Sequence, residues 1–182
     1  MPLIYMIRHG KAAAGFASHA NPGLDEQGVR QAEATAEALA SVGPLPVYSS
    51  PLARAVETAM PLARRWQVEP VIEPRVAEIP SPTEDLAERG AWLRQIMQGR
   101  WQYLDQSLQA WRRDLVEFLA GLEQDAVVFC HFIAINVAVG AARNDDRLVV
   151  FPPDYGSVTL LSNDHGALEL LELGRSAQTQ VN

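Results

Sequence analysis

The sequence predicts an α/β fold: a three-layer sandwich in which a mainly parallel sheet carries helices on both faces and ends in a C-terminal hairpin. Short, uninterrupted apolar runs, such as those at 4–7 and 126–129, are typical of strands that are covered on both faces. These runs alternate with longer stretches of helical period, an order that is typical of parallel sheets with crossover helices. Near the C-terminus, two strand-like runs flank a cluster of turn residues, which predicts the hairpin.

The first half of the chain divides at recognisable start and stop signals. Asp25 is a good N-cap for a helix that runs to about Ser41, after which Gly43 and two prolines end it. Ser50 and Pro51 predict the start of the next helix, as its N-cap and its first residue. The predicted order is a strand over 4–7, a loop over 11–23, the first helix, a strand over 47–49, the second helix, and a strand over 68–72.

The second half alternates in the same way and closes with the hairpin. A proline-rich loop over 74–82 precedes a helical pattern over 84–122, with an apolar stripe of Leu104, Leu108, Trp111, Leu115, Phe118 and Leu122. The remaining predictions are a strand over 126–129, a helix over 133–142, a strand over 147–151, and hairpin strands over 157–161 and 167–171 that turn through 163–166. We expect residues 1–174 to form a single domain and residues 175–182 a flexible tail.

The composition argues against several broad classes of protein. The chain has 182 residues, 48% hydrophobic and 20% charged, which suits one domain with a full core. Its formal net charge of −7 argues against broad nucleic-acid binding, which needs a basic face. No stretch resembles a membrane span or a secretion signal. The single cysteine, Cys130, fits a reducing compartment, so we expect a cytoplasmic protein whose oligomeric state stays open.

Polar side chains follow three of the predicted strands at the point where each strand ends. Arg8 and His9 follow the first strand, Ser50 follows the second with Arg54 soon after it, and His131 follows the apolar run near residue 130. Because the carboxyl ends of parallel strands meet at one edge of a sheet, we expect these groups to converge. Arginine forks match phosphate oxygens, and a helix N-terminus adds free N–H groups. The cluster therefore predicts a site for a small phosphorylated substrate.

Four sequence blocks resemble the histidine phosphatase superfamily, also called phosphoglycerate mutase-like. They are RHG at 8–10, LDEQGVRQA at 24–32, SSPLARAVETA at 49–59 and CHFIAIN at 130–136. The blocks stand in the family's order and span most of the chain. One position departs from the family pattern: the second histidine is usually followed by glycine, whereas Phe132 follows it here.

The resemblance implies a role for each residue of the cluster. His9 would attack phosphorus and form a phosphohistidine, which requires a neutral imidazole, and flanking arginines disfavour the imidazolium. Arg8, Arg54 and His131 would bind the phosphate and stabilise charge on its equatorial oxygens, which makes His131 a catalytic residue as well. The family carries a general acid in the loop after the third strand, where Glu78 lies, with close alternatives at Glu73, Glu84 and Asp85.

The implied activity is that of a metal-independent phosphomonoesterase without a cofactor. Three alternatives stay open: a phosphoglycerate mutase, a phosphohistidine protein phosphatase, and a non-catalytic module that binds a phosphorylated ligand. The four histidines lack the close helical spacing of common zinc motifs, so no metal is expected. Cys130, within an apolar run, is interpreted as core. Lys11 and His19 either reach a substrate or lie on a surface loop.

Overall fold

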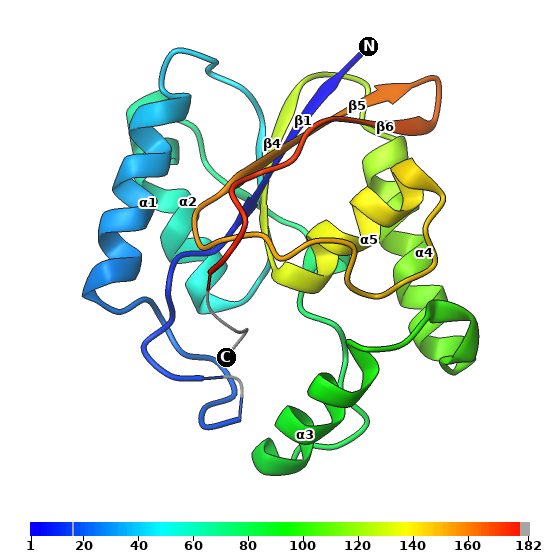
Figure 1. Cartoon of the computed structure of the whole chain (residues 1–182). Coiled ribbons are helices and arrows are strands. Elements are labelled where there is room, and N and C mark those ends of the chain that lie inside the picture. Colours follow the sequence, from blue (N-terminus) through cyan, green and yellow to red (C-terminus); the bar gives the residue numbers. More distant parts are fainter. Residues whose placement is uncertain (16, 179–182) are drawn as a thin grey trace.

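The described residues form a six-stranded sheet at the centre of the molecule, and helices cover both faces of the sheet (Figure 1). The computed structural model describes residues 1–15 and 17–178. The carboxyl ends of the parallel strands lie on the side of the molecule where a small helix and the loop over 11–23 extend away from the sheet. This end of the sheet is the one that carries the predicted polar cluster.

The sheet has the mainly parallel arrangement that the sequence predicts. Its strands are, in chain order, β1 (Leu3–Arg8), β2 (Val47–Ser49), β3 (Val71–Ile72), β4 (Ala126–Cys130), β5 (Val158–Asp164) and β6 (Ala167–Glu172). They lie side by side in the order β3-β2-β4-β1-β5-β6. The first four strands pair in parallel, whereas β5 and β6 run antiparallel at one edge and form the predicted hairpin. Its turn residues, His165 and Gly166, take the positive φ values that a two-residue hairpin turn requires.

The helices are divided between the two faces of the sheet. They are α1 (Glu26–Leu39), α2 (Ala53–Trp66), α3 (Leu86–Ile96), α4 (Gln106–Ala120) and α5 (Phe132–Arg143). Val127 and Phe129 of β4 pack with α1 and α2, whereas Val128 packs with α4 and α5 on the opposite face. Side chains of a strand alternate between faces, so a strand that is apolar throughout must be covered on both. The predicted three-layer sandwich is therefore confirmed.

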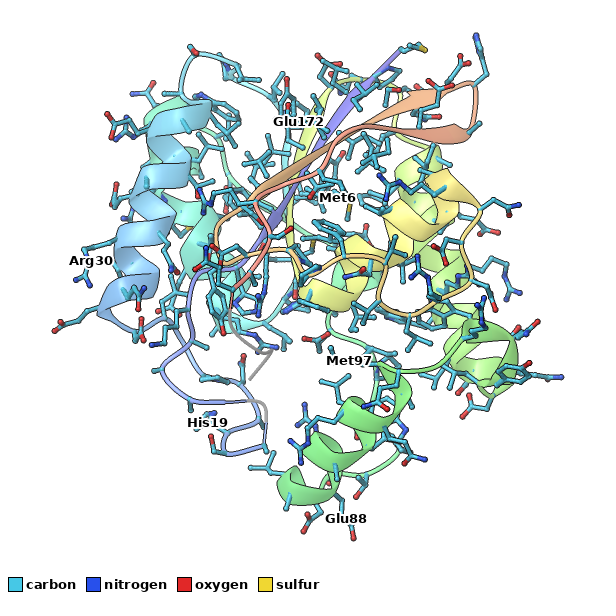
Figure 2. The ribbon with its side chains drawn as sticks, in the orientation of Figure 1. Met6, His19, Arg30, Glu88, Met97 and Glu172 are labelled. Carbon is cyan, nitrogen blue, oxygen red and sulfur yellow. The ribbon has the colours of Figure 1, made fainter. Side chains whose placement is uncertain are left out.

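Side-chain directions agree with this layering. Figure 2 shows Met6 of β1 inside the molecule, whereas Arg30 of α1 and Glu88 of α3 extend from the outer sides of their helices. α3 stands apart from the sheet, beyond the carboxyl end of β1 (Figure 1). None of the described helices is long and apolar enough to cross a membrane.

The start of α2 differs from the prediction, because Ser50 does not act as its N-cap. The helix begins at Ala53, and Leu52 holds the N-cap position without a side-chain hydrogen bond. The amide of Ala53 instead donates to the side-chain oxygen of Asn21, from the loop over 11–23, at 2.9 Å. Ser50 is fully buried, and its hydroxyl lies 2.8 Å from Nε2 of His131. A distant residue therefore caps the helix, and Ser50 belongs to the site.

The third strand is shorter than the predicted span of 68–72, because it comprises Val71 and Ile72 alone. The chain leaves α2 through Gln67, which has a left-handed φ of 54°. The amide of Val68 then still donates to the carbonyl of Ala63 at 3.0 Å. The residues directly after the helix thus complete its C-terminal cap and are not available for the sheet.

The long helical pattern over 84–122 divides into α3 and α4, with a short 3-10 helix (Trp101–Tyr103) between them. Asp105 starts α4, because its carboxylate accepts the amide of Leu108 at 3.0 Å. A second short 3-10 helix, Pro74–Val76, lies within the predicted proline-rich loop. The apolar stripe of the prediction points into the core through Leu108, Leu115, Phe118 and Leu122, which are all buried.

The predicted strand over 147–151 is wrong, because a buried side chain takes the place of a strand partner. The amides of Val150 and Phe151 both donate to Oδ1 of Asn136, at 2.6 and 3.1 Å. Nδ2 of Asn136 donates to the carbonyl of Phe132 at 2.9 Å. Asn136 lies on α5 and is fully buried. The segment is therefore held against α5 as an irregular chain and forms no strand.

The segment predicted as a flexible tail, 175–182, lies partly within the described residues. The amide of Asp154 donates to the carbonyl of Arg175 at 2.8 Å, and the amide of Ala177 donates to the carbonyl of Pro152 at 2.7 Å. This part of the segment is tied to the loop before β5. The last four residues lie outside the described residues, so flexibility stays a prediction for them.

The contacts of Asn136 generate a stability prediction. Asn136→Ala removes the acceptor of the Val150 and Phe151 amides, and each buried unsatisfied amide costs about 1–3 kcal/mol. We expect the free energy of unfolding to fall by about 3 kcal/mol, measured by urea denaturation. The matched control is Gln109→Ala, which removes an exposed hydrogen bond to the carbonyl of Leu104 and should change stability by less than about 0.5 kcal/mol. Equal losses in the two variants would contradict the role of Asn136.

Candidate functional site

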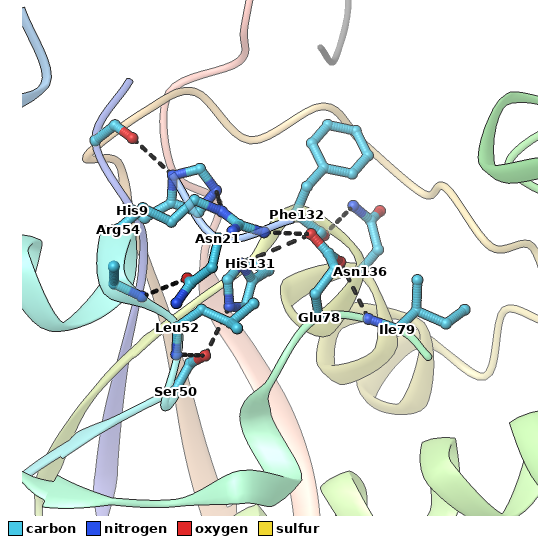
Figure 3. Close-up of polar contacts among 12 residues, drawn as sticks. His9, Asn21, Ser50, Leu52, Arg54, Glu78, Ile79, His131, Phe132 and Asn136 are labelled. Atoms are coloured by element: carbon cyan, nitrogen blue, oxygen red, sulfur yellow. Dashed lines mark hydrogen bonds and ion pairs between the residues drawn. The ribbon is translucent and has the colours of Figure 1, made fainter. Parts of the chain in front are cut away.

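The predicted polar residues meet at the carboxyl ends of three neighbouring strands (Figure 3). Arg8 ends β1 and His9 follows it, Ser50 follows β2, and His131 follows β4 and precedes α5. Arg54 lies in the first turn of α2. All five residues are buried, with exposed fractions of 6% or less. The parallel pairing of β1 and β2 with β4 is what brings these groups together.

The ring of His9 has one nitrogen that carries a proton and one that does not. Nδ1 lies 2.6 Å from the carbonyl of Gly10, and because a carbonyl only accepts, Nδ1–H must be the donor. Nε2 therefore keeps its lone pair, and it accepts a hydrogen bond from Nε of Arg54 at 3.3 Å. Burial lowers the pKa of His9 well below its usual value, and the charges of Arg8 and Arg54 lower it further. His9 is thus neutral, with Nε2 free to act as a nucleophile.

Gly10 allows the backbone to pass closely over the start of α1. A Cβ at this position would lie 2.6 Å from the carbonyl oxygen of Gly28, which is fixed backbone. The amide of Gly10 donates to Oγ1 of Thr58 on α2 at 2.9 Å. These contacts fix the Gly10 carbonyl that orients His9. A larger residue at position 10 would clash with α1, which explains the glycine after the histidine.

His131 is fully buried behind the other site residues. Its Nε2 lies 2.8 Å from Oγ of Ser50, and its Nδ1 lies 3.6 Å from Oε2 of Glu78. The rings of His131 and His9 are tilted, with their centroids 5.2 Å apart. Burial lowers the pKa of His131 well below its usual value, and the nearby charge of Arg54 adds to this effect. His131 is therefore a second neutral imidazole in the site.

Glu78 is the acidic residue of the loop after β3 that reaches the site. Its Oε2 lies 3.5 Å from Nη2 of Arg54 and 3.6 Å from Nδ1 of His131, and Figure 3 shows the carboxylate between these two side chains. The alternatives are turned elsewhere. Glu73 pairs with Arg75 at 2.8 Å, Asp85 caps α3, and Glu84 is exposed.

The sequence did not predict the residues that hold Arg8. Its Nη1 donates to the carbonyl of Pro153 at 2.9 Å, and its guanidinium lies 4.0 Å from the ring centroid of Tyr155. Phe132, the residue that replaces the usual glycine, places its ring centroid 5.3 Å from the same guanidinium. Both distances are within the range of cation–π attraction. The aromatic pair thus fixes Arg8 from the loop before β5 and from the start of α5.

A pocket of about 230 Å³ opens above the reactive groups. Arg8, His9, Arg54 and Glu78 line it together with Phe132 and Tyr155, and its wall is completed by Leu93 of α3 and by the loop over 11–23, which contributes Lys11, Ala12, Ala13, Ala14, Gly15, His19, Ala20 and Pro22. Figure 2 shows His19 on that loop. The loop residues Lys11 and His19 therefore do reach the pocket.

The side chains of the site suit an anion. Two arginines and the neutral His9 line one pocket, His131 is buried next to them, and Glu78 is the one carboxylate among the described residues that line it. Among the described residues, no three His, Cys, Asp or Glu side chains form a group that could hold a metal ion. Cys130 is fully buried, and burial raises the pKa of its thiol, so it is not poised to react. Forked and planar donors of this kind match the oxygens of a phosphate.

Comparison with known proteins gives a family match over nearly the whole chain. The family model described as "Histidine phosphatase superfamily (branch 1)" matches residues 4–176. Among curated proteins, the chain is 26% identical over 118 residues to a protein of Proteus mirabilis named "Probable phosphoglycerate mutase GpmB". That match covers 63% of this chain and 49% of the relative, so the chain spans about half the length of the curated relative that it matches.

Two solved structures illustrate the shared fold. A mycobacterial glucosyl-3-phosphoglycerate phosphatase complexed with VO3 has a TM-score of 0.75 at 24% identity, and the match covers 97% of this chain and 100% of the other. A phosphoserine phosphatase from Entamoeba histolytica, in complex with 3-phosphoglyceric acid, has a TM-score of 0.77 at 19% identity, with 97% and 98% covered. At these identities the likeness shows the fold.

Because His9 and His131 are buried and neutral, we expect the free energy of unfolding to fall in mild acid. The pKa values of His9 and His131 are lowered in the folded state, whereas an unfolded histidine titrates near 6.5. Below that pH the unfolded state binds more protons, so the free energy of unfolding should fall as the pH decreases from about 6.5. Each histidine contributes up to about 1.4 kcal/mol per pH unit, measurable by urea denaturation at about pH 7.5 and about pH 5.

Two variants isolate the contribution of the site. His131→Asn should reduce the slope of stability against pH below about 6.5, because it removes one of the two groups that gain a proton on unfolding. His165→Asn is the matched control, since His165 is 97% exposed in the hairpin turn, and it should leave the slope unchanged. A His131→Asn slope equal to that of the wild type would show that His131 is not held neutral.

Proposed function

The chain belongs to the histidine phosphatase superfamily, and we propose that it hydrolyses a small phosphomonoester through a phosphohistidine formed on His9. One observation carries the proposal: Nε2 of His9 holds a lone pair, and Arg8 and Arg54 line the same pocket as His9. The neutral imidazole is a nucleophile, and Arg8 and Arg54 provide the charge that an anionic ester requires. The reaction so drawn uses no metal ion and no cofactor.

In the first step, Nε2 of His9 forms a bond to phosphorus while the ester P–O bond breaks. The leaving oxygen takes a proton that the monoanionic ester brings into the site and that the carboxyl group of Glu78 delivers, and Glu78 lies 3.5 Å from Arg54. Arg8, Arg54 and His131 stabilise the negative charge on the three equatorial oxygens.

In the second step, water attacks the phosphorus and the P–N bond breaks. The carboxylate of Glu78 now accepts a proton from the water, and inorganic phosphate leaves. His9 returns to its neutral state with its Nδ1–H still donating to the carbonyl of Gly10. The same carboxyl group therefore acts as acid and then as base, which is consistent with its single position between Arg54 and His131.

The pocket favours a small substrate. Its volume of about 230 Å³ is below the range of about 300–1,000 Å³ that is typical of sites for drug-sized ligands. His9 is only 6% exposed, so a phosphorylated side chain on a protein surface would have to reach far into the pocket. This depth argues for a small ester over the phosphohistidine protein phosphatase alternative.

Phosphoryl transfer of the phosphoglycerate mutase type is the second candidate function. It is favoured by the name of the Proteus mirabilis relative, although the chain spans about half of that protein. The two solved structures compared above carry the names of phosphatases, which favours hydrolysis. A mutase returns the phosphoryl group to a hydroxyl, whereas a phosphatase releases inorganic phosphate, so product analysis separates the two.

The cellular setting stays a prediction. The net charge of −7 argues against a nucleic-acid partner, and the single cysteine is consistent with a reducing, cytoplasmic environment.

A non-catalytic phosphate-binding module is disfavoured because it would not need both histidines and both arginines in the same cluster.

The phosphohistidine can be trapped. Rapid quenching with a radiophosphorus-labelled aryl phosphate, in the presence of a chelator, should label His9 with an adduct that is stable to base and labile to acid. His9→Asn should abolish both the label and the release of inorganic phosphate. Label on a serine or on Cys130, or loss of all activity on chelation with recovery on adding a divalent ion, would contradict the proposed mechanism.

The role of Glu78 predicts a dependence on the leaving group. Glu78→Gln keeps the size of the side chain but cannot deliver a proton, which matters most for a poor leaving group such as an alkoxide. We expect hydrolysis of alkyl phosphates to slow by roughly 100-fold or more, and hydrolysis of aryl phosphates with acidic phenols to slow much less. The comparison is made by kcat on matched pairs of esters.

Glu84→Gln serves as the matched control, because Glu84 lies in the same region of the chain, is exposed and does not line the pocket. It should leave both classes of ester unaffected. Equal losses for alkyl and aryl esters in Glu78→Gln would show that Glu78 does not protonate the leaving group.

A further inference from the structure

Ser50 and His131 form a fully buried pair behind Arg8, His9 and Arg54. Both side chains have an exposed fraction of 0%, and Oγ of Ser50 lies 2.8 Å from Nε2 of His131 (Figure 3). Neither residue is among those that line the pocket, and Ser50 lies at Nε2 of the His131 ring, whereas Glu78, which does line the pocket, lies at Nδ1. If the proton between Ser50 and His131 is on Oγ of Ser50, Nδ1 of His131 carries the proton of the neutral ring and is a donor. If it is on Nε2, Nδ1 is an acceptor.

The hydrogen bonds around Ser50 place the shared proton on its hydroxyl. A serine hydroxyl has one proton and two lone pairs. The amide of Leu52 donates to Oγ at 3.2 Å, so that contact uses a lone pair. Within the described ranges, Nε2 of His131 is the acceptor within reach of the hydroxyl proton. If Nε2 carried a proton instead, the buried hydroxyl would have two donors and no acceptor.

The other side of the ring leads to the same assignment. Nδ1 of His131 is buried and, among the described residues, has no hydrogen-bond partner, and it faces Oε2 of Glu78 at 3.6 Å. A ring lone pair directed at a carboxylate oxygen would be repelled, whereas an N–H bond directed at it is attracted. The two sides of the imidazole therefore agree that Nδ1 carries the proton.

We propose that Ser50 is a positioning residue that holds the proton of His131 on Nδ1, so that this N–H points toward the place of a phosphoryl oxygen. Nδ1 and the guanidinium of Arg54 both face the same oxygen of Glu78, so the Nδ1 side of the ring is the side on which the phosphate-binding arginine lies. In the opposite tautomer, Nδ1 would present a lone pair to the phosphate and repel it. The catalytic consequence rests on the proposed phosphatase function, but the tautomer itself does not.

The tautomer can be observed directly. Long-range proton–nitrogen correlation spectra of the uniformly nitrogen-labelled protein distinguish a histidine protonated on Nδ1 from one protonated on Nε2, and the His131→Asn spectrum assigns the signal. We expect His131 of the wild type to be protonated on Nδ1. In Ser50→Ala the Nε2–H form should become substantially populated, because the hydroxyl that disfavours it is gone.

Ser49→Ala is the matched control for this measurement. Ser49 is equally buried and adjacent, but its hydroxyl donates to the carbonyl of Ser50 at 2.9 Å and not to His131. It should leave the tautomer unchanged. A wild-type His131 protonated on Nε2, or a Ser50→Ala spectrum identical to that of the wild type, would overturn the proposal. Ser50→Cys, whose thiol is a weak donor, should give an intermediate population and provides the test if Ser50→Ala does not fold.

Kinetics then test whether the tautomer matters for catalysis. Ser50→Ala should lower kcat/KM about tenfold, because the tautomer that repels the phosphate becomes the more populated one. In a His131→Asn background, Ser50→Ala should cause no further loss, since Ser50 acts through the ring. Independent, additive losses would overturn the positioning role.

The two proposals fail in different ways. If the wild type released no phosphate from any ester while its spectra still showed His131 protonated on Nδ1 under the control of Ser50, the phosphatase function would be wrong and the proton assignment would stand. If the enzyme hydrolysed esters but the tautomer did not respond to Ser50→Ala, the positioning role would be wrong and the phosphatase function would stand.

Discussion

The parallel pairing of β1 with β4 is the constraint on which the site depends. The two strands run in register from Ile4 opposite Ala126 to Arg8 opposite Cys130, and the amide of His9 continues the ladder by donating to the carbonyl of Cys130 at 3.0 Å. Two histidines thus leave neighbouring strands at the same height, with ring centroids 5.2 Å apart. A slip of one residue would turn each side chain to the opposite face of the sheet and separate them.

The site gathers positive charge where burial makes charge costly. Burial lowers the pKa values of Arg8, Arg54, His9 and His131, and the arginine charges lower those of the two histidines further. Aromatic rings and a backbone carbonyl surround one guanidinium, and the carboxylate of Glu78 faces the other. A phosphate dianion compensates such a cluster, and the same electrostatics that attract it leave an unprotonated imidazole to attack it. The arginine charges therefore contribute both to anion binding and to keeping the nucleophile unprotonated.

The members of the cluster could be predicted because each of them lies at the end of a strand or in the first turn of a helix. The apolar period of a segment is a local property, and it located the ends of β1, β2 and β4, and with them Arg8, His9 and His131. The choice among the acidic residues of the loop after β3 could not be made in this way. Glu73 and Glu78 stand five positions apart in a proline-rich segment without a sequence period that ranks them, and only the fold turns one toward Arg75 and the other into the pocket.

The α/β class, the alternation of strands and helices, and the residue types at the carboxyl ends of the strands follow from local patterns in the sequence. The tertiary structure alone decided which partner each buried polar group takes. Ser50 forms a hydrogen bond with His131, 81 positions away, and Asn21 of another loop caps α2 in its place. Asn136 accepts the amides of Val150 and Phe151, which would otherwise be available to a strand. Arg8 is held by a carbonyl 145 positions away, beside the ring of Tyr155. The reason is that a buried donor or acceptor must be paired with whatever group the fold places within about 3 Å, and local sequence patterns carry no information on that distance.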